Sequence, residues 1–125
     1  MHKRLLKTAA LLMAIAVGLG AFGAHVLKSY LDQSALAIFE TGVRYQFYHS
    51  LSLLACGILY KDFSGKRLIW AARMFMIGIL IFCVSLYALA LLLPDYKFIG
   101  AITPLGGLSF IVGWLLLFAA FNEKK

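Results

Sequence analysis

Long runs of apolar residues constrain the fold of this chain more than any other feature. They cover about residues 8–27, 37–60, 68–93 and 98–121, and none of them alternates between apolar and polar positions. A helix needs roughly 20 apolar residues to cross a hydrocarbon core about 30 Å thick, whereas the strands of a membrane barrel alternate in short segments. With 63% hydrophobic residues and a mean hydropathy of +0.92, residues 1–125 therefore predict one all-α domain, an integral membrane four-helix bundle.

The first apolar run has a second interpretation. The basic start MHKRLLK, the apolar run and the small residues of AFGA also resemble a secretory signal peptide. Cleavage would leave three spans and an N-terminus outside the cytoplasm. Because the run is long enough to span a bilayer, we expect a retained first helix.

The net charge of +7 is distributed unevenly along the chain. If there are four spans, one side of the membrane carries most of the basic residues, namely Lys3, Arg4, Lys7, Lys61, Lys66, Arg67, Lys124 and Lys125. On the other side, Lys28 and Lys97 are offset by Asp32 and Asp95. The positive-inside rule then predicts that both termini are cytoplasmic. The basic residues also suit anionic lipid headgroups on that side, and their positions argue against a nucleic-acid surface.

The first run contains the spacing G-x-G-x-x-G at Gly18, Gly20 and Gly23. A dinucleotide site needs a strand before these glycines and a helix after them, and here a long apolar run precedes them. Small residues also let membrane helices approach closely. We therefore expect residues 18–23 to be a packing surface, with helix-packing seams at Ala16, Gly20 and Gly23, at Gly78 and Ser85, and at Gly106, Ser109 and Gly113. Pro104 is expected at the first position of the last helix, capped by Thr103, with residues 100–102 outside the helix.

Polar residues gather near the outer ends of the predicted spans. Helical rise of about 1.5 Å per residue places most of them at a similar depth and His49 closer to the middle. One interpretation is that these residues satisfy one another and anchor the helices. The other is a binding or conduction site, and for His49 the two stay open. The candidate site comprises His25, Glu40, Arg44, Tyr45, Gln46, His49, Tyr87 and Thr103.

The stretch FETGVRYQFYHSLSLL holds several of these candidates. Asp32 or Ser34 can cap its helix. Glu40 and Arg44 have the spacing and order of a favourable helix ion pair, and Gln46 and His49 are expected to form an amide–imidazole pair on another face. The pattern predicts an amphipathic interfacial extension that leads into the second span.

The sequence predicts no cofactor and no metal site. Cys56 and Cys83 fall at different depths and form no C-x-x-C motif, so we expect two apolar, unpaired residues. A haem carrier would need His25 and His49 on one iron, although their depths differ by roughly 9 Å.

Three motifs, GAFGAH, YQFYH from Tyr45 to His49, and GAITPLGGLSFIVGW, resemble the YgdD/YwdK-like family of small bacterial membrane proteins. The resemblance covers nearly the whole chain. It implies a four-span protein of the bacterial cytoplasmic (inner) membrane and supplies no reaction.

The residues and the resemblance together favour a non-enzymatic membrane protein. Such a protein would contribute to membrane or envelope integrity, or associate with other membrane proteins. The alternative is a small transporter or channel-like protein with a polar site near His49 and the outer interface, although a proton-coupled transporter usually needs a buried carboxylate. No catalytic constellation supports an enzyme acting on lipid. The expected partner is the lipid bilayer, and homo-oligomerisation is left open.

Overall fold

The computed structural model describes residues 1–92 and 98–123. The expectations that concern Leu93, Asp95, Lys97, Lys124 and Lys125 lie outside these residues. Within them the chain forms helices and no strand. The elements are α1 (Lys3–His25), η1 (Leu27–Ser29), α2 (Gln33–Leu59), α3 (Lys66–Gly78), η2 (Ile79–Cys83), α4 (Val84–Leu92) and α5 (Ile99–Ala120). The predicted all-helical class is confirmed.

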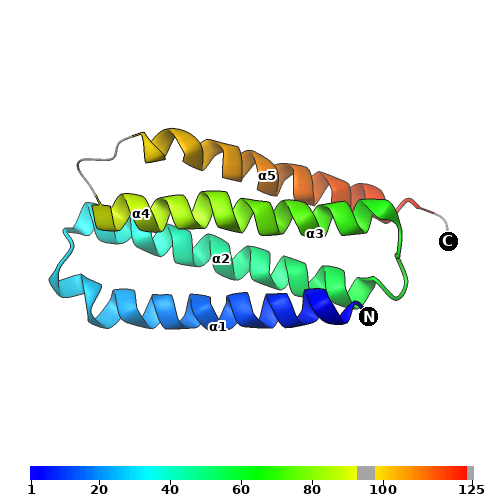
Figure 1. Cartoon of the computed structure of the whole chain (residues 1–125), viewed down its shortest axis with the longest axis horizontal. Helices are drawn as coiled ribbons and strands as arrows, with labels where there is room; N and C mark the ends of the chain where they lie inside the picture. Colours follow the sequence, from blue (N-terminus) through cyan, green and yellow to red (C-terminus); the bar gives the residue numbers. More distant parts are fainter. Residues whose placement is uncertain (93–97, 124–125) are drawn as a thin grey trace.

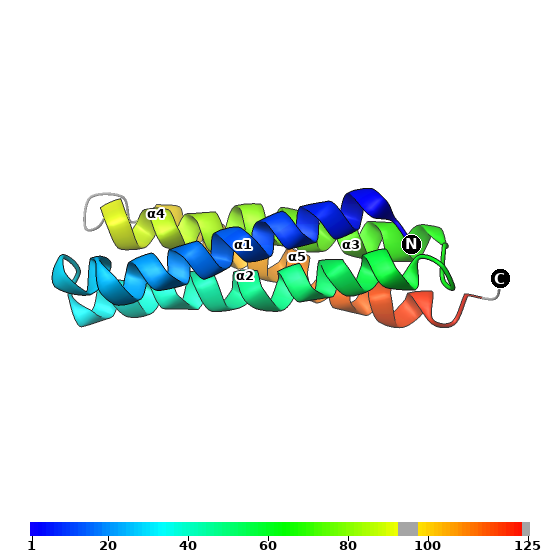
Figure 2. The same cartoon turned by 90° about the horizontal axis from the view of Figure 1, so that it is seen from below.

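Four helical rods run side by side in alternating directions (Figures 1 and 2). The elements α3, η2 and α4 form one continuous rod, which we call the α3–α4 rod. The main contacts of α1 are with α2, and those of α5 are with α3 and η2. Figure 1 accordingly shows the order α5, α3–α4 rod, α2 and α1 across the molecule. The α3–α4 rod and α2 are therefore central, and α1 and α5 lie outside them.

Three segments are long and apolar enough to cross a membrane: Lys3–Ser29, Lys66–Leu92 and Ile99–Ala120. The helix α2 has sufficient length, with 27 residues, and it lies beside the others over its whole length (Figure 2). Its hydropathy is lower because Glu40, Arg44, Gln46 and His49 all belong to it. It is one continuous helix, capped by Asp32, whose side chain accepts a hydrogen bond from Ala35 N.

The core follows the interface between α2 and the α3–α4 rod. Leu53, Leu68 and Phe75 are completely buried there. Cys56 and Cys83 are also buried, and both are free thiols. They pack as small apolar side chains, as the sequence predicted.

Small residues lie at the helix contacts. Ala16 and Gly23 of α1 are buried, as are Gly78 and Ser85 of the α3–α4 rod and Gly106 and Gly113 of α5. The closest approach to the backbone of another helix is at Gly106, where a Cβ atom would lie 2.7 Å from the Cα atom of Phe82. Phe82 belongs to η2, a π-helical turn within the α3–α4 rod. One expectation was wrong: Gly18 faces open space, because it lies on the side of α1 that points away from α2.

The start of α5 corrects a second expectation. The helix already begins at Ile99, so Pro104 lies inside it and residues 100–102 are helical. A proline this close to a helix start removes only the hydrogen bond to the carbonyl group of the fourth residue before it, Gly100. The Thr103 hydroxyl does not cap the helix; it donates to the Ile99 carbonyl oxygen at 3.4 Å.

The N-terminus, the α2–α3 connection and the last described residues share one end of the molecule (Figure 1). His2 N donates to the Gly57 carbonyl oxygen at 2.8 Å. Arg67 Nε lies 3.3 Å from Glu123 Oε1, which is the one ion pair found within residues 1–92 and 98–123. The exposed basic residues of this end are Lys3, Arg4, Lys7, Lys61, Lys66 and Arg67. The fold thus gathers most of the described basic residues at one pole.

Candidate functional site

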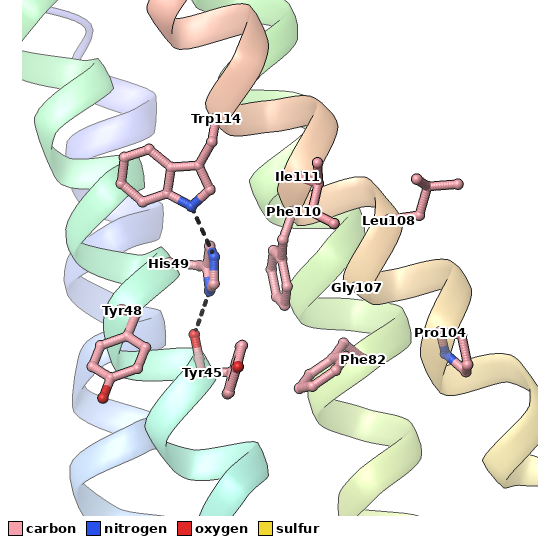
Figure 3. A pocket seen from close by; sticks show the side chains of 10 residues that line it. All are labelled: Tyr45, Tyr48, His49, Phe82, Pro104, Gly107, Leu108, Phe110, Ile111 and Trp114. Atoms are coloured by element: carbon pink, nitrogen blue, oxygen red, sulfur yellow. Dashed lines mark hydrogen bonds between the residues drawn. The ribbon is translucent and has the colours of Figure 1, made fainter.

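A groove opens on the side of the molecule between α2 and α5 (Figure 3). Its volume is about 720 Å³, and most of its lining consists of aromatic side chains. We call it the aromatic groove. It is lined by Tyr45, Tyr48, His49, Phe82, Pro104, Gly107, Leu108, Phe110, Ile111 and Trp114.

Helical spacing explains why these residues share the groove. Tyr45, Tyr48 and His49 follow one another at i, i+3 and i+4 on α2, so their side chains lie on one face of that helix. On α5, Phe110 and Trp114 have the same i, i+4 spacing. The helix α5 contacts mainly the α3–α4 rod, and Phe82 of η2 therefore lies at the bottom of the groove between the two walls.

His49 is the central polar group of the groove. Its Nδ1 atom lies 2.8 Å from the Tyr45 carbonyl oxygen, and Trp114 Nε1 donates to its Nε2 atom at 3.2 Å (Figure 3). A carbonyl oxygen only accepts and an indole N–H only donates. The two bonds therefore select a neutral imidazole with its proton on Nδ1. The imidazole is 4% exposed, and neither ring nitrogen is left free.

Stacked rings hold the walls of the groove together. The ring centroids of His49 and Phe110 are 3.5 Å apart with an interplanar angle of 9°. Tyr45 stacks on His49 at 5.9 Å and contacts Phe82 at 4.7 Å. These contacts link α2, η2 and α5 through side chains. The groove is consequently shaped in advance, with flat apolar walls and fixed rings.

The chemistry available in the groove is limited. A His49 with both nitrogens bonded has no lone pair or proton to offer a substrate without losing a bond to Tyr45 or Trp114. No group of three or more His, Cys, Asp or Glu residues suited to a metal ion occurs in the part of the chain that the structure describes. The arrangement is suited to contact with apolar or aromatic surface.

The other polar candidates form separate contacts rather than one belt. Gln46 Nε2 donates to the Leu12 carbonyl oxygen at 2.8 Å, and the Tyr87 hydroxyl donates to Gln46 Oε1 at 2.7 Å. The expected Gln46–His49 pair is therefore wrong, because each side chain bonds to a different helix. Thr103 Oγ1 lies 2.7 Å from Ser85 Oγ. His25 is exposed at the end of α1.

Glu40 and Arg44 lie on another side of α2, at a second groove. This α1–α2 groove has a volume of about 460 Å³ and is lined by Gly20, Gly23, Phe39, Glu40, Val43, Arg44, Phe47, Tyr48 and Leu51. The expected ion pair between Glu40 and Arg44 is absent among the described residues. Both side chains are exposed, so groups outside the chain can reach them.

The sequence pattern does not identify the η2 and α5 sides of the aromatic groove. From the sequence alone, Phe82, Phe110 and Trp114 are apolar residues of the predicted spans. The usable signal was the shared i, i+4 spacing of Tyr45 with His49 and of Phe110 with Trp114. The spacing alone does not reveal that the two faces point toward each other, because that depends on how α5 sits against η2.

The family model described as "Protein of unknown function (DUF423)" matches residues 19–107. The matched region includes Tyr45 and His49 and stops before Phe110 and Trp114. Among similar proteins, a UPF0382 membrane protein of Staphylococcus saprophyticus is 48% identical over 103 residues, which cover 82% of this chain and 83% of the relative.

The UPF0382 membrane protein YwdK of Bacillus subtilis is 41% identical over 107 residues, which cover 85% of each chain. No solved structure matches this chain. The relatives are described as membrane proteins, in agreement with the apolar helices of the fold. The chain belongs to the DUF423 family, the small membrane proteins that include YwdK.

Proposed function

We propose that this protein is a non-enzymatic membrane protein that holds the hydrocarbon chain of a membrane lipid in the aromatic groove and thereby contributes to membrane integrity. The observation that carries the proposal is a preformed, laterally open, mainly apolar groove whose buried imidazole, His49, is already hydrogen-bonded within the protein. Its volume of about 720 Å³ lies within the range of about 300–1,000 Å³ that small-molecule sites usually have.

The internal polar contacts favour this function over transport. A solute pathway needs polar groups that face a passage, whereas Gln46 bonds to Leu12 and Tyr87, and Ser85 bonds to Thr103. The Ser109 hydroxyl likewise donates to the Met74 carbonyl oxygen at 2.7 Å. These bonds join neighbouring helices. They support a structural role for the polar side chains inside the bundle.

The distribution of charge supports an orientation with both termini in the cytoplasm of a bacterium, the protein lying in the cytoplasmic membrane. The basic pole formed by the N-terminus and the α2–α3 connection would face the cytoplasm and its anionic lipids. Reporter fusions at Lys125 and within Lys61–Lys66 should both give cytoplasmic signals. A periplasmic signal at Lys125 would reverse this assignment.

Lipid retention tests the proposed function. Native mass spectrometry of the protein released from nanodiscs should show bound lipid on the wild-type chain. Gly107→Leu places a side chain in the groove, where a Cβ atom at this position would be 3.7 Å from the Phe82 ring, and we expect it to abolish retention. The matched control is Gly18→Leu, because Gly18 faces open space outside the groove. Equal retention by the two variants would refute the proposal.

His49→Phe distinguishes the transport alternative. A phenyl ring keeps the stacking on Phe110 but cannot change charge. We expect a folded variant that rescues a deletion strain under membrane stress. Loss of rescue with an unchanged melting temperature would favour a transporter that uses His49.

A further inference from the structure

Glu40 and Arg44 are two opposite charges without an ion-pair partner in the part of the chain that the structure describes. They lie one helical turn apart on α2, both are exposed, and neither forms an ion pair within residues 1–92 and 98–123. Gln46 and His49 of the same helix bond to neighbouring helices. The two charges thus differ from the amide and the imidazole of α2, whose partners lie within the chain.

The position of Arg44 along the bundle makes an unpaired charge costly. The residue before it, Val43, lies beside Gly20 of α1, at 3.4 Å from a Cβ built on that glycine. Gly20 is five residues from the end of α1 at His25, so this level lies roughly 8 Å inside the helix end. Charged side chains at such depth usually pair or extend toward the interface. Glu40, one turn closer to the α2 N-terminus, lies in that direction.

The surface around these charges is suited to another helix. The α1–α2 groove exposes almost only apolar atoms between the two charged residues and Leu51. Gly20 and Gly23 line its α1 side, where a Cβ atom would face Val43 and Phe39 of α2, so the two glycines leave the groove between the helices unfilled. Packing between helices in lipid depends on close fit, because hydrophobic burial contributes little there.

We propose that a second copy of this chain docks in the α1–α2 groove and forms reciprocal ion pairs, Arg44 with Glu40 of the partner subunit and Glu40 with Arg44 of the partner subunit. A two-fold axis along the membrane normal brings the same surface of each copy together. Each Arg44 then extends one turn toward the acid of the other copy. Both charges and the apolar groove between them are covered by one partner.

Charge complementarity selects a second copy over an anionic lipid headgroup. An anionic headgroup matches Arg44 but is repelled by Glu40, which lies one turn away on the same face. In a parallel copy of α2, the acid lies one helical turn from Arg44, a distance that a long arginine side chain can span, so each Arg44 pairs diagonally with Glu40 of the partner subunit. The interface is therefore self-complementary without any further residue.

Charge reversal tests the dimer. Full-length protein carrying donor or acceptor dyes is reconstituted in liposomes, and association is followed by energy transfer. Glu40→Arg produces a surface with two bases, and Arg44→Glu produces one with two acids. Each variant alone should lose association by at least about tenfold, because like charges oppose each other across the interface. Lys28→Glu, an exposed charge reversal outside the groove, should leave association unchanged.

The decisive measurement is the mixture of the two charge-reversal variants. Chains with Glu40→Arg and chains with Arg44→Glu are complementary to each other, so the mixed sample should regain energy transfer. Recovery also shows that both variants are folded. If only Arg44→Glu loses association and the mixture does not recover, Arg44 binds a lipid phosphate and the proposal is wrong. Absence of energy transfer in the wild-type protein refutes it equally.

Discussion

The aromatic groove and the α1–α2 groove lie on two sides of α2 and share Tyr48. They differ in whether His49, or Glu40 and Arg44, have partners within the described chain. In the aromatic groove, His49 bonds to Tyr45 and Trp114, and the surrounding rings stack on one another. In the α1–α2 groove, Glu40 and Arg44 have no ion-pair partner within the described residues. In the first groove, the buried imidazole has both hydrogen-bond partners within the same chain. In the second groove, the two charges can pair only with groups outside the described residues.

The largest expected effect concerns how closely the helices pack at each groove. Gly106→Ala should lower the free energy of unfolding in detergent by about 1–3 kcal/mol, because the new methyl group overlaps the backbone of Phe82 beneath the aromatic groove. Gly20→Ala adds the same group in the α1–α2 groove at an ordinary contact distance, 3.4 Å from Val43. It should change stability by less than about 0.5 kcal/mol. Equal melting temperatures for the two variants would contradict this difference.

Gln46→Leu tests the polar contacts inside the bundle. The substitution leaves the Tyr87 hydroxyl without its acceptor, which should cost about 1–2 kcal/mol of stability. The double variant Gln46→Leu with Tyr87→Phe removes both partners and should recover part of the loss. A thermal-melting cycle of the four proteins measures the coupling. Strictly additive losses would show that the bond contributes nothing.

Trp114→Phe tests whether α5 determines the protonation pattern of His49. The variant keeps an aromatic ring but loses the indole donor to Nε2, and we expect a cost of about 0.5–1 kcal/mol. The ¹⁵N chemical shifts of the imidazole should change with it. Trp70→Phe is the control, because Trp70 is on α3 and outside the aromatic groove. Unchanged His49 shifts in Trp114→Phe would exclude the hydrogen bond.

The smallest effect is expected for Glu40→Gln. An exposed carboxylate without an ion pair inside the chain should contribute less than about 0.5 kcal/mol to the stability of the monomer. The same variant should nevertheless weaken association between copies in liposomes. Melting in dilute detergent and energy transfer in liposomes measure the two effects separately. A large loss of monomer stability would place Glu40 in an internal contact.

The helix cap and the small residues for helix packing could be predicted from the sequence, because both are recognised from the spacing of residues along the chain. Asp32, one of the two predicted caps, caps α2, and small residues such as Gly78 lie at helix contacts. The extent of α5 was misjudged, because a proline near a helix start is compatible with two starting points. The π-helical turn η2 also went unpredicted, since nothing in the residues of Ile79–Cys83 distinguishes it from an α-helix.

The candidate site was predicted only in part, because the sequence shows local spacing but does not show contacts between distant helices. Tyr45 and His49 could be selected because they are polar or amphipathic residues within an apolar run. Their partner Trp114 is 65 residues away in the chain. Which face of α5 turns toward α2 depends on the close contact between Gly106 and Phe82. That contact is a tertiary property without a local sequence signal.

The bond from Gln46 to the Leu12 carbonyl oxygen has a consequence for biosynthesis. Among the long helices of the described chain, α2 is the one whose hydropathy is too low for a predicted membrane span. Its transfer from the translocon into lipid on its own is therefore unfavourable. The preceding helix α1 leaves the ribosome first and offers Gln46 a partner at once, across the short connection of residues 26–32. The first two helices should therefore partition into the bilayer as one hairpin, with Tyr87 joining Gln46 only after the third rod has emerged.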